Sequence, residues 1–340
     1  MKIIVLAGGG GTRLYPLSTQ DKPKQFLALA NNEPLIINTI KRFLGVVSQE
    51  NVLVVTGKKY EKITHDTLNA FGLGGVKIVY EPCAKNTAPA ISLGVRFAVE
   101  KLGASDSEAL IVVPSDHVIR PTDKYMEYVN IAKEYAEKSG GIVTMGITPT
   151  RPDTAYGYIR ATKNNEKDSI VTKILEFREK PNFDNAQKYV QSGEYYWNAG
   201  MFCFVSKVFE SEIKSCTPDL FELYSQGYNQ FEKNFGKATP QSIDYALAEK
   251  SKNFFVVPMA LDWSDIGGWG AYYEYCEKDE SGNVIIGEAI VKNCKNCLII
   301  SKNGRLSVMG QINNIIVGNG EDVVMLPMDQ SDKIKDILPC

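Results

Sequence analysis

The chain has 340 residues, of which 44% are hydrophobic and 23% charged, as is ordinary for a globular protein. A formal net charge of −2 with no long basic run excludes a protein that tracks a nucleic-acid backbone. No apolar stretch approaches the roughly 20 residues that a membrane-spanning helix needs, so we expect no membrane partner.

Short β-branched runs alternate with helical periodicity through residues 1–146. The predicted strands are Ile3–Ala7, Val52–Thr56, Val76–Tyr80, Ala109–Pro114 and Gly141–Gly146. The predicted helices are Pro34–Leu44, Lys58–Ala70, Ala88–Leu102 and Pro121–Lys138. This alternation predicts a doubly wound α/β domain with a mixed, mostly parallel, Rossmann-like sheet. In such sheets ligands bind beyond the carboxyl ends of the strands.

The pattern changes after Gly146. Predicted elements there are strands at Ala155–Ala161 and Ile170–Phe177 around a polar turn at Lys163–Asp168, a helix at Asp184–Ser192, a strand at Gly200–Ser206 and helices through Pro218–Lys250. We expect this region to fold onto the same sheet as an insertion or lid.

From Asn283 onward, short β-branched runs are separated by Asn and Gly turns. These runs are Val284–Val291, Cys297–Ser301, Ile315–Val317 and Val323–Leu326. They predict a small all-β, β-helix-like appendage, although no strict period is visible. The expected domains are therefore residues 1–275 and 283–340.

A glycine-rich loop follows the first predicted strand: Gly8–Gly11, then Thr12 and Arg13. Glycines let backbone N–H groups approach phosphate oxygens, and Arg13 adds a charged fork. The loop is not a P-loop, because no Gly-Lys-Ser/Thr follows. It is not the dinucleotide fingerprint either, because Arg13 stands where the third Gly should be. A nicotinamide-dependent oxidoreductase also needs an acidic residue after the second strand, where Gly57-Lys58-Lys59 stands.

The loop and the basic segment after it resemble a known signature. LAGGGGTRLYPLSTQDKPKQFL is similar to that of the mannose-1-phosphate guanylyltransferases, or GDP-mannose pyrophosphorylases, a branch of the sugar nucleotidyltransferases. Further matches follow in order: EPCAKNTAPAI at 81–91, PSDHVI at 114–119, AYGYI at 155–159, EFREKP at 176–181, WNAGMF at 197–202 and DWSDIGGW at 262–269. The resemblance is strong over about 1–275. Tyr15 and Thr19 depart from the Trp and Arg common in bacterial relatives.

The resemblance implies transfer of GMP from GTP to α-D-mannose 1-phosphate, giving GDP-mannose and pyrophosphate, with Mg²⁺ as cofactor. Joining two anionic substrates requires positioning and charge neutralisation. The attacking phosphate has a second pKa near 6, so it is ionised at neutral pH and needs no general base. The two histidines, His65 and His117, are accordingly expected to pack or support neighbours.

Residue roles also follow from the resemblance. The implied catalytic residues are Arg13 and Lys24 on the triphosphate and Lys180 on the sugar phosphate. Asp116 and Asp265 are the implied Mg²⁺ ligands, although an Asp at a strand end often only caps a turn. The implied nucleotide-binding residues are Ala7, Gly8, Gly9, Gly10, Gly11, Thr12, Glu81, Asn86, Thr87 and Ala88. The implied sugar-phosphate-binding residues are Tyr156, Gly157, Glu179 and Asn198, with residues 156–158 closing the pocket.

Other hypotheses stay open. The same chemistry on another sugar 1-phosphate or another base is one, because side-chain identities leave guanine and adenine unresolved. A non-catalytic paralogue that senses GDP-mannose is another. It would be expected to lose at least one of five residues, all of which are present: Arg13, Lys24, Asp116, Lys180 and Asp265.

The remaining expectations concern setting and assembly. Seven scattered cysteines predict reduced thiols in a cytoplasmic protein, and Cys294-x-x-Cys297 lacks the second pair that a zinc site needs. The β-rich tail often mediates contacts in relatives, so the corresponding expectation is a homodimer. Many bacterial relatives carry a C-terminal cupin-like phosphomannose isomerase domain. This chain is shorter, and we expect it to lack isomerase activity.

Overall fold

The computed structural model describes residues 1–29, 31–161 and 170–338, so the predicted turn at 163–168 lies outside the described residues. Backbone contacts divide the chain into two compact units. The first comprises Met1–Gly8, Ile37–Ser115 and Ile119–Trp263, and the second comprises Gly9–Ile36, Asp116–Val118 and Ser264–Cys340. The helices in the described ranges are all too short or too polar to span a membrane.

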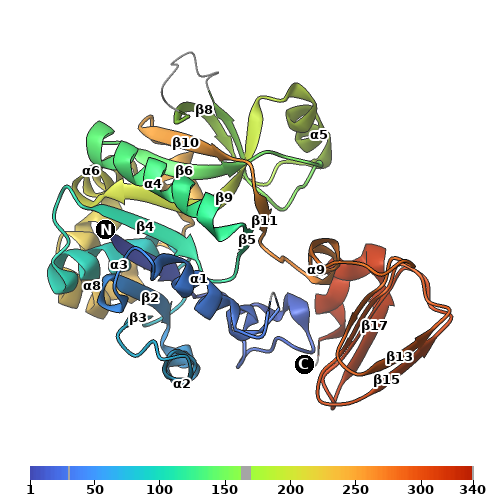
Figure 1. The fold of residues 1–340 in the computed structure, drawn as a ribbon. Helices are drawn as coiled ribbons and strands as arrows, with labels where there is room; N and C mark the ends of the chain where they lie inside the picture. The colour runs from blue at the N-terminus through green and yellow to red at the C-terminus, as the bar shows by residue number, and fades with distance from the viewer. Residues whose placement is uncertain (30, 162–169, 339–340) are drawn as a thin grey trace. The chain divides into compact units, whose positions relative to one another are not determined.

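A nine-stranded mixed sheet forms the centre of the first unit (Figure 1), in the order β3-β2-β1-β4-β9-β6-β10-β8-β7. Its strands are β1 (Lys2–Leu6), β2 (Val52–Gly57), β3 (Lys77–Glu81), β4 (Ala109–Pro114), β6 (Ile142–Ile147), β7 (Tyr158–Ala161), β8 (Thr172–Arg178), β9 (Tyr195–Val205) and β10 (Phe254–Met259). The first four strands in this order are mutually parallel. β9 runs antiparallel to both β4 and β6. Because β7 also pairs with β9, the predicted insertion belongs to this same sheet.

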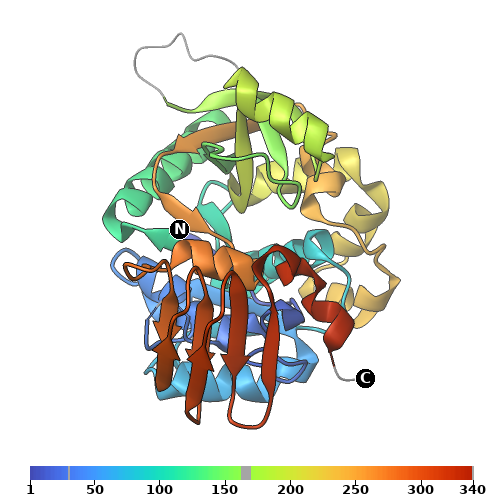
Figure 2. The ribbon, with the colours of Figure 1, turned by 90° about the vertical axis from the view of Figure 1, so that its right-hand side faces the viewer.

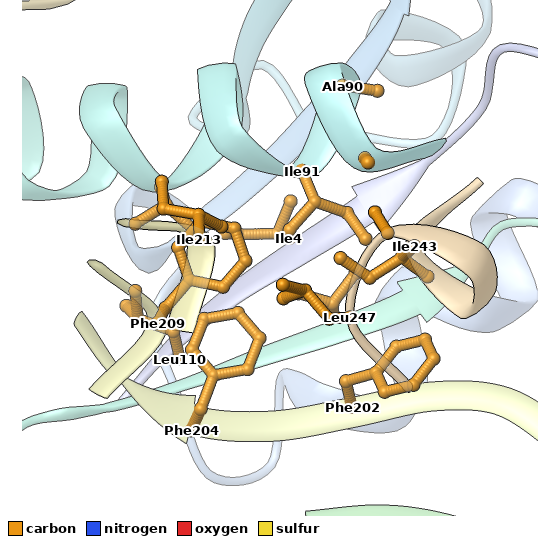
Figure 3. Packing of buried hydrophobic residues seen from close by; sticks show 14 of the residues in the cluster. Ile4, Ala90, Ile91, Leu110, Phe202, Phe204, Phe209, Ile213, Ile243 and Leu247 are labelled. Atoms are coloured by element: carbon orange, nitrogen blue, oxygen red, sulfur yellow. The ribbon is translucent and has the colours of Figure 1, made fainter. Parts of the chain in front are cut away.

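Helices cover both faces of this sheet. They are α1 (Leu35–Phe43), α2 (Glu61–Ala70), α3 (Thr87–Leu102), α4 (Thr122–Ser139), α5 (Phe183–Ser192), α6 (Ser206–Cys216), α7 (Pro218–Tyr224), α8 (Tyr228–Asn234) and a π-helical turn at Asp244–Ala248. Ile4 of β1 and Phe202 of β9 join one large core with residues of α3, α6 and the π-helical turn (Figure 3). Phe43 of α1 and Tyr125 of α4 make a ring contact at 6.2 Å and are both fully buried. Successive strand residues point to opposite faces, so the sheet is buried on both sides, as the continuous apolar runs predict.

The second unit collects the glycine loop and the C-terminal elements around one core. Its elements are two short 3₁₀ turns at Thr12–Leu14 and Lys24–Phe26, helix α9 (Trp269–Tyr275), strands β12 (Val284–Ile286), β13 (Ala289–Lys292), β14 (Leu298–Ser301), β15 (Leu306–Met309), β16 (Asn314–Gly318) and β17 (Val323–Pro327), and a 3₁₀ segment at Met328–Ile337. Leu14 and Leu27 are buried in the same cluster as Trp269, Ile315 and Ile334. These bounds differ from the expected domains 1–275 and 283–340, because the loop after β1 packs with the C-terminal strands.

The C-terminal strands stack into two sheets, ordered β12-β14-β16-β17 and β13-β15 (Figure 2). All pairings except β16–β17 are parallel. Partners lie 17 positions apart in β13–β15 and β14–β16 and 14 positions apart in β12–β14, and Asn296 Nδ2 donates to Oδ1 of Asn313 at 3.2 Å. Both asparagines have positive φ angles, 53° and 54°, which asparagine tolerates better than most residues. The register thus reveals a repeat that composition alone does not.

Two short strands, β5 (Val118–Arg120) and β11 (Asp262–Ser264), form a separate two-stranded sheet. Neither is predicted from the sequence.

Candidate functional site

Lys24 is the centre of a charged cluster in the second unit. Its side chain is largely buried, and its Nζ lies 2.9 Å from Oδ2 of Asp116. The same ammonium donates to the main-chain oxygens of Asp265 and, at 3.2 Å, of Ile266. Burial would raise the pKa of Asp116, but the charges of Lys24 and His117 outweigh burial and hold this pKa below its usual value. The structure therefore brings together three predicted site residues, Lys24, Asp116 and Asp265.

The backbone beside Asp265 is strained. Ile266 is fully buried and has φ 43°, a conformation that β-branched residues rarely adopt. Its N–H donates to the Ser264 hydroxyl at 3.1 Å, and Gly267 N–H donates to Oδ1 of Asp265 at 3.2 Å. These bonds fix the turn that directs the Asp265 and Ile266 carbonyls at Lys24. The sequence gives no signal of this strain beyond the motif in which Ile266 lies.

The glycine loop approaches the same lysine. Gly11 has φ 52°, and a Cβ there would lie 2.7 Å from the backbone nitrogen of Lys24, so only glycine fits. A Cβ at Gly9 or Gly10 would meet no described atom within 4 Å, which leaves open space above the loop. Arg13 is exposed, and no hydrogen bond or ion pair joins its guanidinium to another residue of the described ranges. The loop thus presents an exposed guanidinium beside open backbone.

The predicted nucleoside residues lie in the first unit, at the end of β3 and the start of α3. A Cβ on Gly8 would lie 2.9 Å from Oε2 of Glu81, so glycine makes room for this carboxyl. Glu81 is buried, and burial raises its pKa to about 7. Asn86 has φ 68° and caps α3, accepting from Thr87 N–H at 2.8 Å. The Ala7 N–H donates to the Val55 carbonyl, and the Ala7 carbonyl accepts from the Thr56 hydroxyl.

The predicted sugar-phosphate residues gather at another part of the first unit. A Cβ on Gly157 would lie 2.6 Å from Oε2 of Glu179 and 3.5 Å from Cβ of Asn198. Lys180 has φ 44° and pairs with Glu179 at 2.7 Å between Nζ and Oε1. Left-handed backbone immediately before a proline is unusual, so tertiary contacts must hold this lysine in place.

Aromatic rings flank this group of residues. Tyr156 packs against Trp197 and Trp263, with ring centroids 5.1 Å apart in each case. Tyr158 is instead fully buried, and its hydroxyl accepts from Asp153 N–H at 2.9 Å. Of the two tyrosines in residues 156–158, Tyr158 is therefore part of the protein core.

Sequence reasoning missed Asp244. It lies in the π-helical turn, and its Oδ1 accepts from Nδ2 of Asn198 at 2.9 Å. No local pattern marks an aspartate in Ser-Ile-Asp-Tyr as a partner of a residue on β9. Thr144 of β6, whose hydroxyl lies 3.1 Å from Oδ1 of Asn198 and 2.9 Å from the Met201 carbonyl, was missed for the same reason.

His117 and the C-x-x-C cysteines lie in surroundings that fit packing or support of neighbours. His117 lies 3.9 Å from the Asp116 carboxylate, and His65 is exposed on α2. Cys294 and Cys297 are free, buried thiols that donate to main-chain carbonyls. Within the described ranges, no three His, Cys, Asp or Glu side chains converge to hold a metal ion. Any metal at Asp116 and Asp265 would thus take its other ligands from the substrate or solvent.

This fold and these clusters define a nucleotidyl transferase, and residues 2–282 match the Nucleotidyl transferase family model. The mannose-1-phosphate guanylyltransferase of Salmonella montevideo is 35% identical over 337 residues, covering 95% of this chain and 70% of that protein. The alginate biosynthesis protein AlgA of Pseudomonas aeruginosa is also 35% identical, covering 98% and 70%. The chain belongs to the family of mannose-1-phosphate guanylyltransferases.

A solved structure agrees with the fold. The crystal structure described as mannose-1-phosphate geranyltransferase from Thermus thermophilus superposes with a TM-score of 0.90 at 29% identity. The match covers 99% of this chain and 97% of that chain, so the similarity includes the C-terminal strands. The predicted Rossmann-like α/β fold is confirmed.

Proposed function

We propose that this protein transfers GMP from GTP to α-D-mannose 1-phosphate and releases pyrophosphate. The observation that carries the proposal is the convergence of Asp116 and the Asp265 segment on the buried ammonium of Lys24. A cation held between an ionised carboxylate and main-chain oxygens suits a reaction in which phosphate charge shifts without a covalent enzyme intermediate.

The chemistry is an in-line displacement at the α-phosphorus of GTP. A phosphate oxygen of mannose 1-phosphate forms the new P–O bond, and the bond to the oxygen bridging the α- and β-phosphates breaks. The attacking oxygen is already ionised near neutral pH, so no side chain has to remove a proton. Arg13 and Lys24 would neutralise the departing pyrophosphate, and Lys180 would bind the phosphate of the sugar. Release of Lys180 from Glu179 accompanies that binding.

The acidic residues fit Mg²⁺. Hard carboxylate oxygens are the ligands that Mg²⁺ prefers, and one or two carboxylates plus substrate phosphates are its usual set. Asp116, whose lowered pKa keeps it ionised, and Asp265 would supply those carboxylates. When bound, the ion supplies charge neutralisation for the phosphates.

Selectivity would come from groups in the first unit. Glu81 and Asn86 have the acceptors and donors that read a purine edge, and Glu179 and Asn198 those that bind sugar hydroxyls. Gly8 to Gly11 and Thr12 would bind the triphosphate through backbone N–H groups, with Ala7, Thr87 and Ala88 shaping the nucleoside side. Tyr156 and Gly157 would line the sugar side.

Pyrophosphate release from a panel of nucleoside triphosphates and sugar 1-phosphates tests this function. GTP with mannose 1-phosphate should give the highest kcat/KM, and removal of Mg²⁺ should abolish the signal. Faster turnover of another pair would redirect the assignment to another sugar or base. Tight binding of GDP-mannose with no turnover of any pair would favour a regulatory paralogue.

We also propose a short β-helix over residues 283–338, following a catalytic region within about 1–275. The end of the family match at residue 282 and the 17-residue register support this division. Exposed apolar side chains at Met309, Ile312, Val323 and Met325 support a homodimer. Light scattering across a concentration series tests that assembly, and a constant monomer mass would overturn it.

A further inference from the structure

The side-chain amide of Asn198 is held from two sides. Its Oδ1 accepts from Gly200 N–H at 3.2 Å and lies 3.1 Å from the Thr144 hydroxyl, whose single hydrogen also has the Met201 carbonyl within 2.9 Å. Its Nδ2 donates to Oδ1 of Asp244 at 2.9 Å. An amide nitrogen has two N–H groups, so among the described contacts one N–H of Asn198 is left for a ligand.

This arrangement fixes what Asn198 can recognise. The remaining N–H can only donate, so the ligand atom that it meets must be an acceptor, such as a sugar or phosphate oxygen. Without Asp244 the amide would lose the acceptor that orients this donor.

The segment that carries Asp244 is anchored in the protein core. Ile243 and Leu247 are 5% and 1% exposed and point into the large cluster with Phe202 (Figure 3). The turn from Asp244 to Ala248 is π-helical, an irregularity that is frequent at functional sites. The carboxyl is therefore placed by rigid neighbours.

The same segment is bonded to the start of α3. Ile243 N–H donates to the Thr87 hydroxyl at 2.8 Å, and Ala88 N–H donates to the Gln241 carbonyl at 3.0 Å. Gln241 N–H donates in turn to the Lys85 carbonyl at 3.2 Å. Residues 241–244 thus join the proposed nucleoside residues to Asn198.

Asp244 lies close enough to the Glu179–Lys180 ion pair to interact with both charges. Burial, together with the nearby Glu179 carboxylate, raises the pKa of Asp244 to about 6, while Lys180 and the Ser242 hydroxyl act in the opposite direction. Asp244 and Glu179 thus both contribute negative charge near Lys180. A sugar phosphate bound at Lys180 would interact electrostatically with both carboxyls.

We propose that Asp244 is a positioning residue of the sugar 1-phosphate subsite, which orients Asn198 as a hydrogen-bond donor to an acceptor oxygen of the sugar. The inference deepens the proposed function and rests on it for the identity of the subsite. Because the core anchors and the contacts to α3 do not involve the carboxylate, its loss should affect the sugar substrate and spare GTP.

Steady-state kinetics of Asp244→Ala and Asp244→Asn test the inference. Asp244→Ala should raise KM for mannose 1-phosphate about tenfold, with KM for GTP within about twofold of wild type. Asp244→Asn keeps an acceptor for Asn198 and should recover much of the loss. The preference for mannose 1-phosphate over glucose 1-phosphate, as a ratio of kcat/KM, should fall in Asp244→Ala. Glu249→Gln removes a carboxylate just past the same turn and is the matched control, expected to behave as wild type.

Further variants and readouts separate the outcomes. Thr144→Val removes the hydroxyl beside Oδ1 of Asn198 and should shift KM for mannose 1-phosphate in the same direction, so the inference stays testable if Asp244→Ala does not fold. Equal losses for GTP and sugar, or an unchanged sugar KM in all three variants, would overturn the positioning role.

The function and the inference can fail separately. No wild-type turnover of GTP with mannose 1-phosphate would defeat the proposed function alone. Calorimetric binding of the sugar 1-phosphate panel to wild type and Asp244→Ala would then decide the inference. Weaker binding by the variant supports it, equal binding overturns it, and a wild type that binds none of the panel overturns both.

Discussion

The Nζ of Lys24 lies 2.9 Å from Oδ2 of Asp116, and the two side chains are 10% and 30% exposed. Partial shielding from water strengthens this attraction relative to an exposed ion pair, which contributes little. The pair therefore keeps a cation and an ionised carboxylate together before any substrate binds.

Lys24→Met should lower kcat by about 10²–10³, the range found when one preorganised donor to developing charge is removed. Lys22→Met, in the same loop but exposed, should change kcat by less than about twofold. Pyrophosphate release at saturating substrates measures both. Equal effects of the two substitutions would show that position beside Asp116 does not matter.

Chelation of divalent ions should abolish turnover, and Mg²⁺ should restore it. In Asp116→Asn and Asp265→Asn, the Mg²⁺ concentration giving half the maximal rate should rise about tenfold or more, because each change removes an anionic ligand. Asp262→Asn changes an exposed carboxylate of the same motif and should leave the Mg²⁺ requirement unchanged. Unaltered Mg²⁺ titrations in the first two variants would remove both residues from the metal site.

The buried Glu81 carboxyl should make stability fall with rising pH. Its pKa is raised to about 7 in the folded protein, so the folded state binds more protons than the unfolded state between its ordinary value of 4.5 and about 7. The loss in free energy of unfolding caused by ionising Glu81 is absent below that pH window, grows through it, and reaches on the order of 3 kcal/mol above it.

Thermal unfolding at pH 5 and pH 8 tests this sign. Glu81→Gln carries no titrating group, so its Tm relative to wild type should be higher at pH 8 than at pH 5. Glu274→Gln, a 72% exposed side chain, should give no such difference between the two pH values. A relative Tm for Glu81→Gln that falls with pH would contradict the raised pKa.

Substitutions of two glycines in the C-terminal strand region distinguish the effect of backbone strain on stability from that of steric overlap. Gly287 and Gly310 have φ 84° and 69°, but a Cβ would overlap the Ser301 carbonyl oxygen only at Gly287. Gly310→Ala should destabilise the fold by about 1–2 kcal/mol through its left-handed backbone alone. Gly287→Ala should cost a further 1–3 kcal/mol, roughly, through overpacking. Urea unfolding measures both, and equal losses would rule out the overlap.

Much of the α/β fold can be predicted from the sequence, because parallel strands buried on both faces give continuous apolar runs. The run at Ala109–Pro114 coincides with β4, for example. β10 was missed although it lies beside β6, since Pro258 interrupts its apolar run. The stacking of β13 on β15 was missed because two turns form too short a repeat to show in composition.

Some residues of the candidate site can likewise be predicted from the sequence, and others cannot. Motifs single out Lys24, Asp116 and Lys180, because each stands next to glycine, proline or a strand end. Asp244 and Ile266 matter through tertiary contacts and backbone conformation, which leave no local mark. Roles that rest on family resemblance, including the choice of guanine and mannose, stay predictions.

The shared core of the second unit also bears on the order in which the protein is made. Leu14 and Leu27 emerge from the ribosome long before Trp269, Ile315 and Ile334, which complete their core. The glycine loop therefore lacks these packing partners until the later segments have been synthesised. A nascent chain should therefore gain a stable glycine loop, and with it affinity for GTP, only after these later segments have left the exit tunnel.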